Sequence, residues 1–367
     1  MTDTLSPREL LRSFGPAAEL SHDLSPFALG GYPATSSLAE LFESQPFLMA
    51  PMAGVSDAAY RLMARAGGAA LAYTEMVSVA GIHYSGSKTW ELALPAADEP
   101  DIAVQLFGRD PSQFEEAAAA VRERLGDKLA LIDINMACPV PKVVRKGEGS
   151  ALLDEPERAA DIVRACLRAA GVPVTVKMRL GRRPDAIVAP DFARALEAAG
   201  AHALAVHGRS ASQLYRGQAD WDAIAQVVDA VDIPVIASGD VFTAQTACDI
   251  LEHTGAAAAF IARGSYGTPW IFRHAQTLRS GHVPQAVSLD VRIAAFELHL
   301  RLLEATHAHM ARARSLAGWY FKGIPHAADF RRDAMECSSL SDFLALVAQV
   351  RERLCRWETE HGSLNVG

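Results

Sequence analysis

One segment of the sequence combines a thiol, an amide and several cations, as an active site does. The apolar run of residues 129–132 is followed within a few positions by Asn135, Cys138 and Pro139. A loop carrying Lys142, Arg145 and Lys146 comes next. An apolar run that ends in reactive side chains is typical of a barrel strand that delivers them to the barrel mouth, and the cations indicate an anionic ligand. Cys138 is therefore the candidate catalytic residue.

Other catalytic patterns do not occur in the sequence. The remaining cysteines lie far apart and form no CxxC pair, which predicts neither a disulfide framework nor a zinc site. No HExxH or EF-hand pattern is found, so no metal is expected. No GxGxxG follows an apolar run, and residues 148–152 do not form the GxSxG turn of a hydrolase. A Rossmann nicotinamide site and a serine hydrolase are both disfavoured.

The elements that position these residues alternate along the chain. Short apolar runs predict strands at 47–53, 70–76, 102–107, 129–135, 173–178, 203–207, 233–237 and 257–262. Amphipathic, alanine-rich stretches predict helices between them, including 57–66, 111–125, 155–170, 190–199, 220–229 and 243–253. Eight strands alternating with helical stretches over roughly 230 residues favour an α/β fold of the (β/α)8 TIM-barrel type over an open doubly wound sheet.

Three parts of the chain are predicted from this pattern. Residues 1–45 form an N-terminal extension rich in Pro and Gly, residues 46–280 the barrel, and residues 281–367 a smaller all-α C-terminal domain, because the apolar spacing from about 288 to 360 is helical. A net charge of −8 over 367 residues argues against a generally basic, nucleic-acid-coating surface but allows a local basic patch. No membrane span or signal peptide is indicated, which makes the cytoplasm the expected location.

The carboxyl ends of the predicted strands carry a second set of candidates. Small residues after strands seven and eight, with Arg263 beside them, suit a phosphate cradle, and Gln105, Lys177 and His207 are placed to line a planar ring. Lys177 supplies a cation where a reduced flavin is negative. Any one of these residues alone would more simply be structural, but all eight strands end in this way. The predicted cofactor set is Pro51, Met52, Ala53, Gln105, Asn135, Lys177, His207, Ser238, Gly239, Asp240, Ala262 and Arg263.

These residues together resemble the tRNA-dihydrouridine synthases. The similar segments are 50–57, 133–139, 149–153, 176–179, 207–209 and 239–240, and Ala313-Arg314 with 319–323 resembles the helical domain of the bacterial synthase B branch. The family has Gly, Asn and Gly where this chain has Ala137, Ser238 and Ala262. Each departure leaves a backbone amide or a hydroxyl in place, so FMN binding is expected to survive.

The resemblance implies the reaction and its partners. NADPH would reduce FMN, hydride would pass to C6 of a uracil, D-loop uridines being the expected targets, and Cys138 would donate a proton to C5. The barrel would bind FMN, the helical domain would bind tRNA, and the protein is expected to be a monomer without an obligate protein partner. Candidate RNA-binding cations are Lys142, Arg145, Lys146, Arg182 and Arg183 at the barrel rim and Arg312, Arg314 and Lys322 in the helical domain; for the rim, a solvated charge cluster is an equally good interpretation.

Two other functions stay open at this point. A flavin barrel of the dihydroorotate-dehydrogenase or old-yellow-enzyme kind would act on a small molecule, but it would not need the basic and aromatic helical domain. In that domain, Arg312, Arg314 and Lys322, with Arg331 and Arg332, are expected to have no internal partner. A non-catalytic, flavin-bearing RNA-binding protein is the third possibility, and the retention of Cys138 argues against it.

Overall fold

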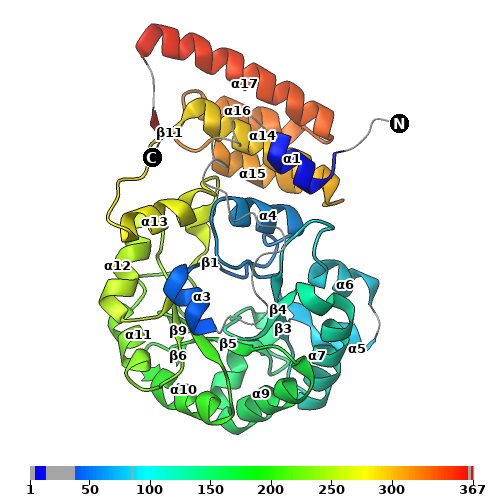
Figure 1. The fold of residues 1–367 in the computed structure, drawn as a ribbon, viewed down its shortest axis with the longest axis vertical. Coiled ribbons are helices and arrows are strands. Elements are labelled where there is room, and N and C mark those ends of the chain that lie inside the picture. The colour runs from blue at the N-terminus through cyan, green and yellow to red at the C-terminus, as the bar shows by residue number, and fades with distance from the viewer. Residues whose placement is uncertain (1–4, 14–37, 85, 363–364, 367) are drawn as a thin grey trace.

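The structure, a computed structural model, describes residues 5–13, 38–84, 86–362 and 365–366. One sheet, ringed by helices, forms the lower part of Figure 1. From β2 onward each barrel strand pairs in parallel with the next barrel strand along the chain, and β10 pairs with β1. The predicted (β/α)8 barrel is confirmed. Its strands are β1 (Phe47–Met49), β2 (Val77–Ser78), β3 (Ile102–Phe107), β4 (Leu129–Met136), β5 (Val174–Arg179), β8 (Ala203–His207), β9 (Val235–Ser238) and β10 (Ala258–Ile261).

The second strand is less regular than the predicted range of residues 70–76. Ala72 makes a single bridge to β1, and its carbonyl accepts a hydrogen bond from the amide of Ala103 in β3, so this segment closes the barrel. The amide of Gln105 then donates to the hydroxyl of Thr74 at 3.0 Å instead of to a backbone carbonyl. This side-chain acceptor interrupts the ladder, and regular pairing resumes only at β2.

The helices that surround the barrel agree with the prediction to within one residue at either end. Several begin at a side-chain cap; for example, the carboxylates of Asp57, Asp110 and Asp220 accept amide hydrogen bonds of α4, α7 and α11. The helices are α4 (Ala58–Ala66), α7 (Pro111–Leu125), α9 (Pro156–Ala170), α10 (Ala189–Ala198), α11 (Trp221–Val228) and α12 (Ala244–Thr254), followed by α13 (Ile271–Arg279), which was not predicted.

Short elements that the sequence did not predict are inserted between strands and helices. They include a small hairpin after β5 and a turn of 3-10 helix after the Cys138 loop, and the two pack against each other. The inserted elements are α5 (Val79–His83), α6 (Ser87–Ala93), α8 (Pro141–Val144), β6 (Gly181–Arg183) with β7 (Ala186–Ile187), and the 3-10 turns η1 (Gly126–Lys128), η2 (Gly149–Asp154) and η3 (Arg263–Ser265).

The barrel interior is filled by alanine and larger aliphatic side chains, together with two aromatic ones from the barrel wall. These are Tyr73 and Phe260, whose rings meet edge to face at 4.8 Å. Helix α3 (Leu38–Ser44) lies across one end of the barrel in Figure 1, and its Phe42 packs into this interior cluster. Part of the predicted N-terminal extension therefore closes the barrel; residues 14–37 lie outside the described ranges.

The C-terminal part is helical, as predicted, and lies at the top of Figure 1. Helix α14 packs on α4 of the barrel and on α17, and α1 (Pro7–Ser13) packs on α14. The domain boundaries at residues 45 and 280 stay predictions. The elements are α14 (Leu289–Ala305), α15 (Arg312–Tyr320), α16 (Ala327–Glu336) and α17 (Leu340–His361), with the two-stranded ribbon β11 (Val287–Ser288) and β12 (Asn365–Val366).

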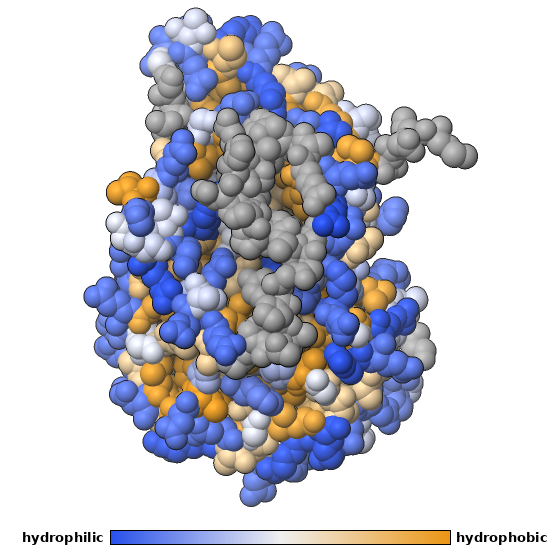
Figure 2. All heavy atoms as spheres, in the orientation of Figure 1, coloured by the Kyte–Doolittle hydropathy of each residue, from blue (hydrophilic) through white to orange (hydrophobic). Residues whose placement is uncertain are grey.

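The surface gives no sign of a membrane-spanning segment within the described ranges. On the face drawn in Figure 2, hydrophilic residues alternate with small apolar patches over the barrel helices. None of the helices described is long and apolar enough to cross a bilayer.

Candidate active site

A cavity of about 370 Å³ lies at the carboxyl ends of the barrel strands. Every residue of the predicted cofactor set lines it, from Pro51 after β1 to Arg263 after β10, and Cys138 lines it too. The residues come together because parallel strands in a barrel all point their carboxyl ends to the same mouth. The structure therefore places the whole predicted set in one site, while the role of each residue stays a proposal.

The Cys138 loop is held to the barrel by Asn135. The side-chain oxygen of Asn135 accepts hydrogen bonds from the amides of Ala137 at 3.1 Å and Cys138 at 2.9 Å. On the other side, the amide of Ser150 donates to the carbonyl of Cys138 at 3.0 Å. Gly149 precedes it with a φ of +60°, and a Cβ there would lie 2.8 Å from that carbonyl oxygen. Only glycine fits this close approach.

A chain of side-chain hydrogen bonds runs from the barrel interior to Asn135. The Nε2 of Gln105 donates to Asp133 at 2.6 Å, and the Nδ2 of Asn135 donates to the Oε1 of Gln105 at 2.8 Å. The hydroxyl of Thr175 also donates a hydrogen bond to Asp133, at 2.6 Å. Burial raises the pKa of Asp133 to about 6, although these donors oppose the shift. The ionised carboxylate accepts from Gln105 and fixes its amide, and through it the amide of Asn135.

Two cations enter the cavity from β5. Lys177 and Arg179 are two residues apart, so both point to the same side of the strand. Burial, followed by the charge of Arg179, lowers the pKa of Lys177 to about 8. Arg179 donates from Nε to the carbonyl of Ala137 at 2.9 Å and so also holds the Cys138 loop. The cavity thus carries positive charge directly beside the thiol.

The thiol itself is expected to keep its proton at neutral pH. Burial raises the pKa of Cys138 above its ordinary value, and the nearby charges of Arg179 and Lys177 offset this only in part. His207, which lies across the cavity, is held neutral because burial and the same cations lower its pKa well below its usual range. Cys138 can therefore act as a proton donor, and its product thiolate would face two cations.

The opposite end of the cavity is built from the loops after β9 and β10. Gly239, which has no side chain, lines this end with its backbone. The two loops touch each other, because a Cβ on Gly264 would lie 2.3 Å from the carbonyl oxygen of Val241. Arg263 adds a guanidinium on this side. Asp240 is held by Arg209 through bonds of 2.9 and 2.7 Å. Backbone and one cation together suit a phosphate.

The residues present fit a flavin mononucleotide. One end of the cavity offers backbone and Arg263 for the phosphate, and the middle offers Lys177 and Gln105 for the polar edge of the ring. Two of the three departures from the family, Ala137 and Ala262, do not conflict with this fit. Ala137 is not among the described residues with positive φ, and Ala262 has a φ of −106°, so neither position requires glycine.

The predicted rim cations lie on two segments that pack against the same element, η2. Lys142, Arg145 and Lys146 are exposed on and directly after α8, which packs on η2. Arg182 and Arg183 lie on β6, which also packs on η2, and they pair with Asp154 at 3.1 Å and Asp185 at 3.2 Å. Their binding of RNA stays a prediction.

The helical-domain cations require a correction. Arg312 does not lack an internal partner, because it pairs with Asp57 at 3.1 Å and with Glu75 at 2.9 Å, both on the barrel. Arg314 donates twice to the carbonyl of Cys337. Arg332, also expected to lack a partner, pairs with Asp329 at 3.1 Å and Asp333 at 3.4 Å on its own helix. Lys322 and Arg331 are exposed. The prediction was wrong on this point because closeness in sequence to aromatic residues does not show which way an arginine points.

Several cavity residues were not predicted. Arg179 could have been found, since it shares the strand face of Lys177. Tyr215 and Phe242 are exposed aromatic residues on the loops after β8 and β9, and the rings lie 4.7 and 5.0 Å from the guanidinium of Arg263. The signal for them is an aromatic residue in a loop that leaves the carboxyl end of a barrel strand.

The fold and the cavity define the chain as a barrel enzyme. A thiol that holds its proton and a buried lysine lie in one cavity at the catalytic end of a (β/α)8 barrel. The chain belongs to the dihydrouridine synthase family, because the sequence model described as dihydrouridine synthase (Dus) matches residues 48–354. Membership in this family makes it a flavin-dependent enzyme and confirms the resemblance seen in the sequence.

Three relatives illustrate the similarity. The chain is 41% identical over 293 residues to the tRNA-dihydrouridine synthase B of Xanthomonas axonopodis pv. citri, covering 77% of this chain and 86% of the relative. It is 39% identical over 311 residues to the synthase B of Pseudomonas aeruginosa, with 83% and 91% covered. A probable tRNA-dihydrouridine synthase of Rhizobium leguminosarum bv. phaseoli is 38% identical over 276 residues, with 75% and 84% covered.

Proposed function

We propose that this protein reduces the C5=C6 bond of specific uridines in tRNA to dihydrouridine, with FMN as its flavin, NADPH as electron donor and Cys138 as general acid. The observation that carries the proposal is the position of Cys138, whose protonated thiol shares one cavity with the predicted flavin-binding residues. When bound, FMN supplies the hydride that adds to C6 of the uracil.

The chain supplies the proton that completes the reduction. The Sγ of Cys138 donates its proton to C5 of the uracil, which leaves a thiolate. Arg179 and Lys177 stabilise that thiolate, as their lowering influence on the pKa of Cys138 indicates. A proton from solvent then restores the thiol. One hydride and one proton thus balance the two hydrogens that the double bond gains.

The cavity also suits a base that has left its stack. A uridine inside folded RNA must rotate outward to reach a reactive group at the bottom of a cavity. The exposed Lys142, Arg145 and Lys146 follow the cavity-lining residues Cys138, Pro139 and Val140 in the chain, and they can hold the RNA backbone while the base enters. The proposal includes a tRNA-binding role for the helical domain, a cytoplasmic location and action as a single chain.

Dihydrouridine mapping tests this function directly. The tRNA of a deletion strain would lack dihydrouridine at defined positions, and a plasmid with the wild-type protein, but not with Cys138→Ala, would restore it. The purified protein should be yellow and release FMN. A full set of dihydrouridines in the deletion strain, together with reduction of a small dienone or orotate by the protein, would favour the small-molecule reductase.

A further inference from the structure

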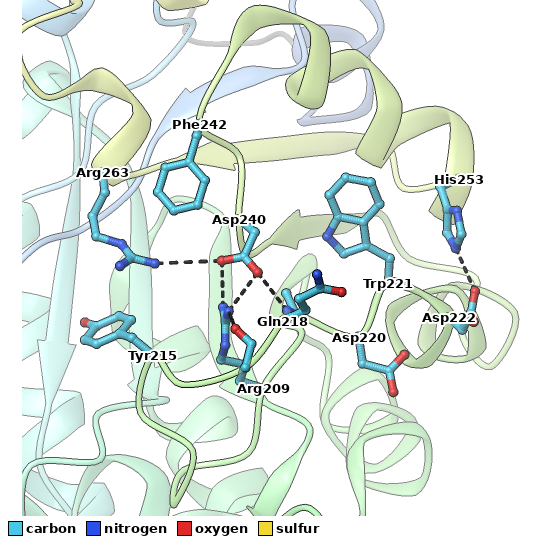
Figure 3. Close-up of a pocket in the computed structure, with 12 residues that line it drawn as sticks. Arg209, Tyr215, Gln218, Asp220, Trp221, Asp222, Asp240, Phe242, His253 and Arg263 are labelled. Carbon is cyan, nitrogen blue, oxygen red and sulfur yellow. Dashed lines mark hydrogen bonds and ion pairs between the residues drawn. The ribbon is translucent and has the colours of Figure 1, made fainter. Parts of the chain in front are cut away.

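A second cavity, of about 710 Å³, opens beside the cavity that contains Cys138 and the predicted FMN-binding residues, here called the flavin cavity (Figure 3). Tyr215, Asp240, Phe242 and Arg263 line both cavities, so the two spaces meet at these residues. We propose that the second cavity binds the adenosine diphosphate half of the nicotinamide dinucleotide that reduces the flavin. The inference rests on the proposed function, which requires a reductant and assigns no residues to it.

The walls of this cavity offer flat surfaces for a purine. Trp221 lines it and lies between Asp240 and His253 in Figure 3. Its indole N–H donates to the carbonyl of Gly239 at 3.1 Å, which fixes the ring. Tyr215 and Phe242 are 62% and 49% exposed at the junction. The guanidinium of Arg263 lies over both of these rings, at 4.7 and 5.0 Å. A ring that is already fixed loses little entropy when a base stacks on it.

Polar groups are placed to recognise the rest of an adenosine diphosphate. The amide of Gln218 projects between Asp240 and Trp221 in Figure 3, and an amide can both donate to and accept from a base edge. Asp220 caps α11 by accepting from the amide of Ala223, and Asp222 pairs with His253 at 2.6 Å. Both lie at the end away from Arg263, where the second carboxylate oxygen of each can accept from the exocyclic amino group of an adenine. The Arg263 guanidinium at the junction offers donors for the diphosphate.

The charge of the cavity favours the dinucleotide over RNA. Asp240 pairs with both arginines of the cavity, with Arg209 through two hydrogen bonds and with Arg263 at 3.8 Å, whereas Asp220 and Asp222 lie at the end away from Arg263. A phosphodiester chain that passed through the cavity would meet these carboxylates at close range. The two phosphates of a dinucleotide can instead remain beside Arg263, with the nicotinamide directed into the flavin cavity.

A substitution that fills the second cavity can distinguish binding of the adenosine half of the reductant from binding of its nicotinamide half. Gln218→Trp places a large ring in the second cavity, and Gln226→Trp, at an exposed position of α11 that does not line it, is the matched control. Anaerobic flavin reduction is followed with NADPH and with reduced nicotinamide mononucleotide, which lacks the adenylate. We expect Gln218→Trp to raise the half-saturating NADPH concentration by about tenfold or more, as for the loss of a base stack, and to leave reduction by the mononucleotide unchanged.

Direct binding of ADP-ribose to the FMN-loaded protein decides the matter even if no dinucleotide reduces the flavin. Binding by the wild type and by Gln226→Trp, with loss in Gln218→Trp, supports the site. The inference is overturned if the wild type binds no ADP-ribose, or if Gln218→Trp binds it normally. It is also overturned if that variant affects both reductants equally, or if only its tRNA affinity falls. Failure of the proposed function would appear separately, as an absence of dihydrouridine formation by the wild type.

Discussion

Cys138 is the residue on which the proposed chemistry depends. Its thiol is buried enough to hold a proton and lies among residues predicted to bind FMN. We expect Cys138→Ala to retain FMN and to be reduced by NADPH, but to form dihydrouridine roughly 10² to 10⁴ times more slowly, because a general acid has been removed. Single-turnover formation of dihydrouridine in tRNA measures this. Cys355→Ala, at an exposed position of α17, is the control, and a near-normal rate in Cys138→Ala would contradict the acid role.

Lys177 gives the site a pH dependence. In the FMN-free protein its pKa is lowered to about 8, so the side chain is charged below pH 8 and loses its charge as the pH rises through that value. We expect the FMN dissociation constant to be constant below pH 8 and to rise above it, by roughly tenfold, as a charged hydrogen bond becomes a neutral one. Flavin fluorescence quenching from pH 6.5 to 9.5 measures the constant. Lys177→Met should bind more weakly and show no rise in this interval, and a wild type without pH dependence would exclude Lys177 from the site.

At the scale of elements, the loop between β4 and η2 decides where the thiol lies. Gly149 has a φ of +60°, and its absent Cβ leaves room for the carbonyl of Cys138. We expect Gly149→Ala to displace the loop and lower the single-turnover rate at least tenfold while FMN stays bound. Gly171→Ala is a matched control: its φ of +58° imposes a similar backbone cost of about 1 kcal/mol, but its nearest neighbour is 3.6 Å away. Equal rates in the two variants would mean that the loop tolerates the movement.

At the scale of the whole molecule, Arg312 joins the helical domain to the barrel. It pairs with Asp57 and Glu75, and Glu75 in turn accepts a hydrogen bond from the amide of Gly54, next to the cavity-lining Pro51–Ala53 segment. We expect Arg312→Ala to destabilise the protein by about 1 to 3 kcal/mol, because two carboxylates lose their partner, and to speed the loss of FMN. Thermal unfolding and flavin release measure both. Exposed Arg331→Ala should change neither, and an unaltered Arg312→Ala variant would show that the pairs carry no stability.

The tRNA-binding surface is also a property of the whole molecule. Because Arg314 is engaged by the carbonyl of Cys337, reversing its charge would disturb packing as well as RNA binding. Lys142 and Lys146 avoid this ambiguity since both are exposed. We expect Lys142→Glu/Lys146→Glu to weaken tRNA binding at low salt and to reduce the log–log salt slope by about 0.9 per lost phosphate contact.

The control for the Lys142→Glu/Lys146→Glu variant changes the net charge by the same amount at a different position on the protein. Arg164→Glu/Arg194→Glu reverses two exposed arginines on the outer helices α9 and α10, far from the barrel mouth. Its tRNA affinity should remain close to that of the wild type. If the two double variants behave alike, the effect is one of overall charge and the rim does not bind the RNA.

The sequence by itself determined the barrel and most of the candidate site. Strand and helix periods are local, so the alternation and the strand ends could be found along the chain, and the closed parallel topology then sends every strand end to one mouth. That is why Asn135, Lys177 and Asp240, far apart in sequence, were predicted together. The second strand was predicted less accurately, because the hydroxyl of Thr74 accepts the hydrogen bond from the amide of Gln105 and so interrupts the regular pairing.

Only the tertiary structure decided which charges are free and which loops meet. Whether an arginine such as Arg312 faces solvent or a carboxylate depends on groups more than two hundred positions away, and no local pattern records such a contact. The junction of Tyr215, Phe242 and Arg263 likewise joins loops from three different strands. Their positions follow from the parallel pairing of β8 with β9 and of β9 with β10, which places the three loops that leave these strands side by side, where they line the second cavity.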